Sequence, residues 1–534
     1  MTAAVQPTMT PHQFITKWTG RGFGERQAAQ TWFNDLLRVV GHPDPIERND
    51  RDNFTFEKPV PGGFADAYLA GHFGWEFKGR EADLPDAFNQ LLRYQVYLRT
   101  PPLLIVSSFQ MIRIQTNFPG KETVVHEIPI SELDQPEQRQ KLRNIFFNPT
   151  AFEPERTVEQ VTRETAQLFG DIVRDMENSD VDSNRLARFL NQIVFCLYVE
   201  DTDEIGLLPK GLFTDIAKQH FRSPGTFDQV VRDLFASMKD GGFFGQYQIP
   251  RFNGDLFNEL DTVELSGVAL FELMKAADKN WRNIEPSIFG TLFEGALDAA
   301  KRAQLGAHYT GADDIMLVVE PVVMKPLRRE WDDARSRADI LNDDGKPEEA
   351  RAALDAFRER LTEVTVLDPA CGSGNFLYIT LRSLLDLEKE VIDHAAELEL
   401  GNLTPTVSPR QMYGLEIDPY AAQIARTALW IGYIQWHQFN GFAYRHDPIL
   451  SSLDTIRQTD AILDLSDPDN PKESEWPAAE FIIGNPPFLG HSNNSFHDQL
   501  GEHYTDSLYS LFGNRIPNSS DLCCYWFEKD RKST

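Results

Sequence analysis

Residues 364–376 read Val-Thr-Val-Leu-Asp-Pro-Ala-Cys-Gly-Ser-Gly-Asn-Phe, a short β-rich run that stops at a turn of small residues. The next segment, 377–392 (LYITLRSLLDLEKEVI), has a helical pattern. A strand that enters a helix through such a turn brings backbone N–H groups and the positive end of the helix to one point. Gly372 and Gly374 let a ligand approach the backbone closely. The chain has no Gly-Lys-Ser/Thr ending of a P-loop, so ATP-driven translocation is not expected.

Two further predicted strands end at polar residues. The first, 411–419 (QMYGLEIDP), ends in Glu416, and an acid at that point of a nucleotide-binding sheet can accept hydrogen bonds from both ribose hydroxyls. The second, 480–488 (EFIIGNPPF), ends in Asn-Pro-Pro-Phe. Because proline has no N–H and a fixed φ, the backbone carbonyl beside Asn485 is held rigid. With the Asn485 side-chain carbonyl and the flat ring of Phe488, this turn suits the exocyclic amino group of a flipped-out base.

Together these motifs resemble the S-adenosylmethionine-dependent amino-methyltransferases of DNA, in their N6-adenine branch. The segment 306–311 (GAHYTG) is similar to an additional cofactor motif of that family. The resemblance implies direct in-line methyl transfer to adenine N6, a step that needs no metal. It implies cofactor contacts from Thr310, Asp368, Ala370, Gly372, Gly374, Glu416 and Asp460, the last on the cofactor's adenine where a third strand should end. It implies catalytic roles for Asn485, Pro486, Pro487 and Phe488.

The first 150 residues carry a second candidate site. Alternating runs at 64–69, 72–78, 103–107 and 111–115 predict short strands, and 83–98 predicts an amphipathic helix. Asp66 lies on one strand, and the period of two places Glu76 and Lys78 on one face of the next. Two carboxylates can hold Mg²⁺ through hard oxygen ligands, and a lysine can orient or activate water.

This spacing resembles the D…ExK arrangement of PD-(D/E)xK nucleases, although such a Glu/Lys pair is often only a solvated strand surface. Two observations favour the nuclease interpretation. The apolar residues Phe73, Trp75 and Phe77 point the other way, as a half-buried sheet requires, and the following helix carries Gln90 and Tyr94 on one face. The resemblance therefore implies Asp66 and Glu76 as Mg²⁺ ligands, with Lys78 and Gln90 as further catalytic residues.

The order of these motifs resembles an MmeI-like (type IIL or IIG) bifunctional restriction–modification enzyme. It predicts an α/β multidomain chain, which is consistent with 534 residues. We expect a PD-(D/E)xK-like α/β nuclease domain at 1–150 and a helical connector at 151–300. A Rossmann-like class I methyltransferase core is expected at 301–534. The implied cofactors are S-adenosylmethionine and Mg²⁺, and the implied partner is double-stranded DNA.

The predicted methyltransferase sheet is incomplete. Four strands are expected, near 364–368, 411–416, 459–465 and 480–484, where the family has seven, and only 46 residues follow Phe488. Three explanations remain open. The chain is truncated, or it is a degenerate relic, or it is a half completed by a second polypeptide that supplies the remaining strands and the target-recognition domain. Two alternative functions also remain: a defence-system methyltransferase with a non-cutting N-terminal domain, and a non-catalytic S-adenosylmethionine-binding remnant.

Composition limits the partners and the compartment. Lys and Arg number 52 against 81 Asp and Glu, a formal net charge of −29. Such a chain repels polyanions at long range, so contact with DNA requires a locally basic cleft or a partner. Four scattered cysteines form no disulfide framework or zinc pattern. Without a signal-peptide pattern or a long apolar run, a cytoplasmic location is expected.

Overall fold

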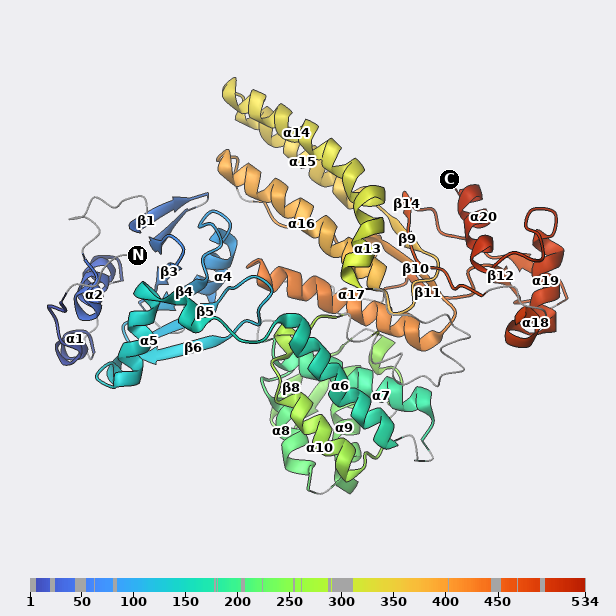
Figure 1. Ribbon diagram of the computed structural model, residues 1–534, viewed down its shortest axis with the longest axis horizontal. Coiled ribbons are helices and arrows are strands. Elements are labelled where there is room, and N and C mark those ends of the chain that lie inside the picture. Colours follow the sequence, from blue (N-terminus) through green and yellow to red (C-terminus); the bar gives the residue numbers. More distant parts are fainter. Residues whose placement is uncertain are drawn as a thin grey trace. The chain divides into compact units, whose positions relative to one another are not determined.

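The computed structural model describes residues 6–19, 25–43, 54–61, 63–79, 84–176, 179, 181–202, 207–222, 224–252, 255–260, 262–286, 290, 311–401, 403–442, 453–467, 469–489 and 495–533 (Figure 1). The chain divides into two compact units. Unit 1 comprises Met1–Val161, Ile392–Thr404 and His437–Ala443, and unit 2 comprises Thr162–Val391, Pro405–Trp436 and Tyr444–Thr534. Within these described ranges, no helix has the length and apolar character needed to cross a membrane.

Unit 1 is built on a six-stranded sheet whose strands lie side by side in sequence order. The pair β3–β4 is parallel, and the other neighbouring pairs are antiparallel. The elements are α1 (Pro11–Trp18), α2 (Glu25–Val40), β1 (Phe54–Val60), β2 (Gly63–Leu69), β3 (Phe73–Phe77), α4 (Leu84–Tyr94), β4 (Leu103–Ser107), β5 (Met111–Thr116), β6 (Val125–Pro129) and α5 (Pro136–Phe147). The predicted strands and helix are therefore confirmed, and the flanking strands β1 and β6 are additions to the prediction.

Both faces of this sheet are covered. One core contains Phe73, Trp75 and Phe77 together with residues of α1, α2 and α5. On the other face, α4 packs over Ala65 and Val106. Because β3 is buried on both faces, the expected half-exposed strand is wrong: the α4 crossover covers the face that carries Glu76. Within unit 1, the turn after α4 contacts the end of α16 (Asn375–Glu397), where the Tyr97 hydroxyl donates to the Asp393 carbonyl at 2.9 Å. The Arg93 guanidinium of α4 donates to the Gly441 carbonyl at 2.7 Å, just after α17 (Pro419–Phe439).

The N-terminal part of unit 2 is helical, as expected, with one added β-hairpin. It contains α6 (Val158–Met176), α7 (Ser183–Glu200), α8 (Leu212–His220), α9 (Phe227–Asp240), β7 (Gly242–Phe244), β8 (Tyr247–Ile249) and α10 (Gly267–Ala277). The apolar helix α7 is buried and packs near α17: the Tyr420 hydroxyl donates to the Ala187 carbonyl at 2.5 Å. The helices α13 (Ala312–Val319), α14 (Lys325–Asp343) and α15 (Pro347–Glu363) follow, and α14 and α15 form an antiparallel hairpin (Figure 1).

A parallel sheet organises the rest of unit 2. Its strands are β9 (Val366–Asp368), β10 (Met412–Glu416), β11 (Ile456–Gln458) and β14 (Phe481–Ile482), in the order β11-β10-β9-β14. Helices α16 (Asn375–Glu397) and α17 (Pro419–Phe439) follow β9 and β10. Since all four strands run the same way, their carboxyl ends lie along one edge of the sheet, and β14 lies beside β9 rather than beside β11.

The expected third strand at 459–465 is wrong. The strand β11 ends at Gln458, and residues 463–464 form β12, which pairs antiparallel with β13 (Lys472–Glu473) outside the parallel sheet. Asp460 causes the change of direction, because its Oδ1 accepts hydrogen bonds from the N–H groups of Ile462 at 2.7 Å and Leu463 at 3.0 Å. The chain ends in α18 (Ser495–Leu500), α19 (Glu502–Phe512) and α20 (Cys523–Ser533), which form a small core with Ile462.

Candidate functional site

The small-residue turn after β9 is held against its neighbours by glycines. Gly372 and Gly374 have positive φ angles of 52° and 84°. A Cβ at Gly374 would lie 2.9 Å from the Cβ of Ala425 in α17, so this glycine is required for packing. A Cβ at Gly372 would meet no atom within 4 Å, so this part of the turn faces open space. Gly372 therefore leaves room for a ligand, and Gly374 keeps the turn close to α17.

Glu416 joins the turn after β9 to the end of β10. Its Oε2 accepts a hydrogen bond from the Gly372 N–H at 2.8 Å, and its Oε1 accepts one from the Asp418 N–H at 2.9 Å. Asp368, which is 1% exposed, accepts a hydrogen bond from the Ala370 N–H at 3.0 Å. The sheet therefore brings the predicted cofactor residues Asp368, Ala370, Gly372 and Glu416 together.

The pKa values of Asp368 and Glu416 both lie near neutral pH. Burial raises the pKa of Glu416 to about 7, although hydrogen bonds from Asp418 and Gly372 oppose the rise. Burial also raises the pKa of Asp368 to about 7, the Ala370 N–H opposes the rise, and the nearby Glu416 charge adds to it. A cationic ligand would stabilise the ionised forms of two carboxyl groups that lie this close together.

The Asn-Pro-Pro-Phe turn lies beside Asp368. A Cβ at Gly484, where φ is 153°, would be 2.4 Å from Asp368 Oδ1. A cavity of about 150 Å³ touches both turns, with Asp368, Pro369 and Ala370 on one side and Gly484 and Pro486 on the other. Its remaining lining residues are Val318, Trp476, Ile482, Ile483, Trp526, Phe527 and Asp530. Asn485 is exposed, and Phe488 exposes 68% of its surface.

The remaining two predicted cofactor residues are Asp460 and Thr310. Asp460 lies two residues after β11, and its carboxylate is engaged by the backbone N–H groups of the following turn and by the Tyr504 hydroxyl. Thr310 lies outside the described residues. Sequence reasoning missed Gly484, Trp476 and Trp526. The glycine directly before the Asn-Pro-Pro-Phe motif was a usable signal for the first, whereas nothing in the local sequence marked the two tryptophans.

The four predicted residues of the N-terminal site are linked in unit 1. Asp66 Oδ2 accepts a hydrogen bond from the Phe77 N–H at 2.7 Å, which ties β2 to the end of β3. Glu76 is 2% exposed, and its Oε2 lies 3.8 Å from Lys78 Nζ. Gln90 Nε2, on α4, donates to Glu76 Oε1 at 3.3 Å. The sheet and α4 therefore assemble two carboxylates, one ammonium group and one amide.

The electrostatics of this site fit a hard cation. Burial and the nearby Asp66 charge together raise the pKa of Glu76 to about 9, although Lys78 opposes the rise. A divalent cation bound between two such carboxylates would stabilise their ionised forms, and oxygen ligands suit Mg²⁺. The described residues contain no group of three or more His, Cys, Asp or Glu side chains arranged to hold a metal ion. Asp66 and Glu76 would therefore need water or substrate oxygens as further ligands.

Two family models match parts of the chain. Residues 344–533 match the family described as "MmeI, DNA-methyltransferase domain", and residues 184–257 match "MmeI, helicase spacer domain". DNA methyltransferase A of Bacillus subtilis (strain 168) is 31% identical over 403 residues, which are 70% of this chain and 42% of that relative. A putative type II restriction enzyme and methyltransferase of Methanocaldococcus jannaschii is 24% identical over 375 residues, 59% of this chain and 32% of the relative.

A solved structure of the type IIL restriction–modification enzyme MmeI in complex with DNA is also similar, with a TM-score of 0.54 and 25% sequence identity. The similarity covers 69% of this chain and 48% of that one. The chain thus spans less than half the length of these three relatives.

Proposed function

We propose that this chain, which carries an MmeI-like DNA-methyltransferase domain at 344–533 and an MmeI-like helicase spacer at 184–257, methylates adenine N6 in double-stranded DNA. The enzyme would belong to a restriction–modification system. The observation that carries the proposal is the cavity shared by the turn after β9 and the Asn-Pro-Pro-Phe turn. One turn would hold the methyl donor and the other the target amine.

The residues of the first turn suit S-adenosylmethionine. The cofactor supplies a methyl group on a positively charged sulfonium. Asp368, Ala370, Gly372, Gly374, Glu416 and Asp460 would hold it, together with Thr310. Asp368 is buried, Glu416 is half-buried beside it, and both have raised pKa values, so they favour a ligand that brings positive charge. Gly372 leaves open space beside Glu416 for the ligand.

The second turn suits the amine of a flipped-out adenine. The Asn485 side-chain carbonyl and the backbone carbonyl of Pro486 would accept the two N–H bonds of the exocyclic amine, which directs its lone pair toward the methyl group. Pro487 keeps the turn rigid, and the exposed ring of Phe488 offers a stacking surface for the base. Catalysis would then consist mainly of positioning and electrostatic stabilisation.

The direct test is methylation of duplex DNA by the purified chain with radiolabelled S-adenosylmethionine, followed by nucleoside analysis of the product. N6-methyladenine is expected. Methylcytosine as the product would refute adenine specificity. Binding of the cofactor without any transfer, even after addition of a complementing polypeptide, would favour a non-catalytic cofactor-binding remnant.

We further propose that unit 1 is a Mg²⁺-dependent DNA endonuclease. The contacts among Asp66, Glu76, Lys78 and Gln90 support this, because they join carboxylate, ammonium and amide groups on β2, β3 and α4. Asp66 and Glu76 would hold the ion, and Lys78 would orient the attacking water. Cleavage of unmethylated duplex with Mg²⁺, and its loss with a chelator, is the expected result. An intact duplex would favour a non-cutting N-terminal domain.

We propose that a partner polypeptide contributes to DNA recognition. In the described residues, β14 pairs with β9 alone, so one edge of the parallel sheet is open to a further strand. The net charge of −29 also favours a separate surface for reading DNA. Co-purification with the product of a neighbouring open reading frame tests the partner.

We propose a cytoplasmic location for the reaction, since the cysteines are free thiols.

A further inference from the structure

Two tryptophans donate hydrogen bonds to the turns that carry predicted cofactor acids. The Trp526 indole N–H donates to the Pro369 carbonyl at 3.0 Å, directly after Asp368. The Trp476 indole N–H donates to the Ala461 carbonyl at 2.7 Å, directly after Asp460. Both rings pack in one small cluster against Leu367, Leu415 and Ile482 of the parallel sheet.

Each indole N–H binds the carbonyl of the peptide unit whose N–H group binds the neighbouring aspartate. The carbonyl of Pro369 and the N–H of Ala370 belong to one peptide, and that N–H donates to Asp368 at 3.0 Å. The carbonyl of Ala461 and the N–H of Ile462 belong to another, and that N–H donates to Asp460 at 2.7 Å. A peptide unit is planar, so a hydrogen bond that fixes its carbonyl also fixes the direction of its N–H. The two turns thus share one arrangement: indole, peptide, carboxylate.

A buried lysine connects the two tryptophans. Lys529 lies three residues after Trp526 on α20, and its Nζ lies 5.5 Å from the centre of the Trp476 ring. The same ammonium donates to the Ser474 carbonyl, and the Ser474 hydroxyl donates to the Asp460 carbonyl at 2.6 Å. Helix α20 therefore reaches the turn after β9 through Trp526 and the turn after β11 through Lys529 and Trp476.

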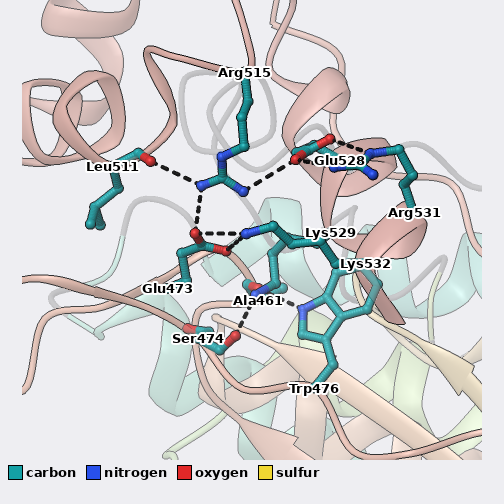
Figure 2. A network of polar contacts seen from close by, with 10 residues as sticks. All are labelled: Ala461, Glu473, Ser474, Trp476, Leu511, Arg515, Glu528, Lys529, Arg531 and Lys532. Atoms are coloured by element: carbon teal, nitrogen blue, oxygen red, sulfur yellow. Dashed lines mark hydrogen bonds and ion pairs between the residues drawn. The ribbon is translucent and has the colours of Figure 1, made fainter. Parts of the chain in front are cut away.

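A network of ion pairs holds α20 in place (Figure 2). Arg515 contacts Glu473 of β13 and lies 3.2 Å from Glu528 of α20. Lys532 of α20 contacts Glu473 at 3.0 Å, and Arg531 contacts Glu528 at 2.9 Å. Burial alone would raise the pKa of Glu473, but hydrogen bonds from Lys532 and Arg515 lower it overall. The network ties α20 to the β12–β13 hairpin, which carries the chain from Asp460 to Trp476.

We infer that Trp476 and Trp526 are positioning residues that orient Asp460 and Asp368 toward the cofactor, with α20 as their common support. This inference rests on the proposed function, because it assumes that the two acids bind S-adenosylmethionine. Neither tryptophan needs to touch the reacting atoms. Loss of an indole N–H frees its peptide unit to rotate, and the acid then loses a hydrogen bond that defines its direction.

The test uses the full chain with Trp526→Phe, Trp476→Phe and the matched control Trp331→Phe. The control residue stacks on Phe357 in the α14–α15 hairpin, away from this cluster. Calorimetry with S-adenosylmethionine should show Kd raised about five- to tenfold in each of the first two variants, the effect of one lost hydrogen bond. The control should bind the cofactor with the wild-type Kd.

A second measurement separates positioning from general destabilisation. The Ala370 N–H lowers the pKa of Asp368, so its release in Trp526→Phe should move the pH midpoint of cofactor binding upward. A change that only loosens the fold lowers Tm without moving this midpoint. If Trp526→Phe does not fold, 3-benzothienylalanine at 526 keeps the ring shape and removes only the N–H donor.

The outcomes distinguish the two proposals. If the wild-type chain does not bind S-adenosylmethionine at all, the proposed function fails. If the wild type binds and folded variants at 476 and 526 bind with unchanged Kd and pH midpoint, the positioning roles are refuted while the proposed function stands.

Discussion

Gly484 lies directly against Asp368: a Cβ built on the glycine would come within 2.4 Å of the carboxylate oxygen Oδ1. The two residues belong to β-strand ends that are far apart in sequence and adjacent in the sheet, because β14 pairs with β9 in parallel. This approach brings the turn that would hold the target base beside the turn that would hold the methyl donor.

We therefore expect Gly484→Ala to impair both stability and cofactor binding. The new methyl group meets Asp368, and the φ of 153° is unfavourable for alanine, so the free energy of unfolding should fall by about 1–3 kcal/mol. Gly345→Ala is the matched control, because Gly345 has a φ of 74° and its Cβ would meet no atom within 4 Å. Urea unfolding and calorimetry with S-adenosylmethionine measure the two effects. Equal Kd values for both variants would contradict the proposed contact.

Asn485→Ala should abolish methylation while the cofactor still binds. The side chain is exposed in the Asn-Pro-Pro-Phe turn and would act on the amine of the base. Loss of one such positioned acceptor is expected to lower the transfer rate by at least about a hundredfold. Single-turnover methylation and calorimetry provide the measurement. A near-normal rate would refute the assignment of Asn485.

Cofactor binding should strengthen as the pH rises through about 7, since Asp368 and Glu416 must be ionised to face a cation and both pKa values lie near 7. Below that pH, binding should release protons, which calorimetry in buffers of different ionisation enthalpy detects. The stability of the ligand-free chain should show the opposite pH dependence. Because these groups hold protons more tightly when folded than when unfolded, stability falls as the pH rises from about 4.5 to 7.

Glu416→Gln provides the variant for this pH test. The amide cannot ionise, so the number of protons released on binding should fall. An unchanged pH profile in this variant would show that Glu416 does not face the bound cofactor.

In unit 1, Glu76→Gln should remove Mg²⁺-dependent cleavage and leave methylation intact. Since burial raises the pKa of Glu76 to about 9, the folded protein already holds this group neutral at pH 7, and the amide should not lower Tm. Glu127→Gln on β6 is the matched control. Its partner Arg113 is partly exposed, so the change should cost less than about 1 kcal/mol and should not affect cleavage. Cleavage that persists in Glu76→Gln would contradict the nuclease proposal.

Much of the site was predictable from local sequence. The strand, turn and helix around Asp368 and the acid at Glu416 follow from short patterns, because backbone preference and turn chemistry act over a few residues. The third strand was misplaced for a local reason too: Asp460 bonds the N–H groups of Ile462 and Leu463 and turns the chain away. An aspartate can cap a turn or end a strand, and the pattern alone does not distinguish these uses.

The sequence by itself determined the order of the motifs, the residue types in them and the α/β character of the chain. Only the tertiary structure decided which motifs meet. The pairing of β14 with β9, the complete burial of Glu76 beneath α4, and the hydrogen bonds from Trp476 and Trp526 all join residues distant in the chain. Such contacts depend on strand order and on helix packing over each face of the sheet. Local periodicity carries no information about either, because it describes only the face a residue occupies and not the neighbour that covers it.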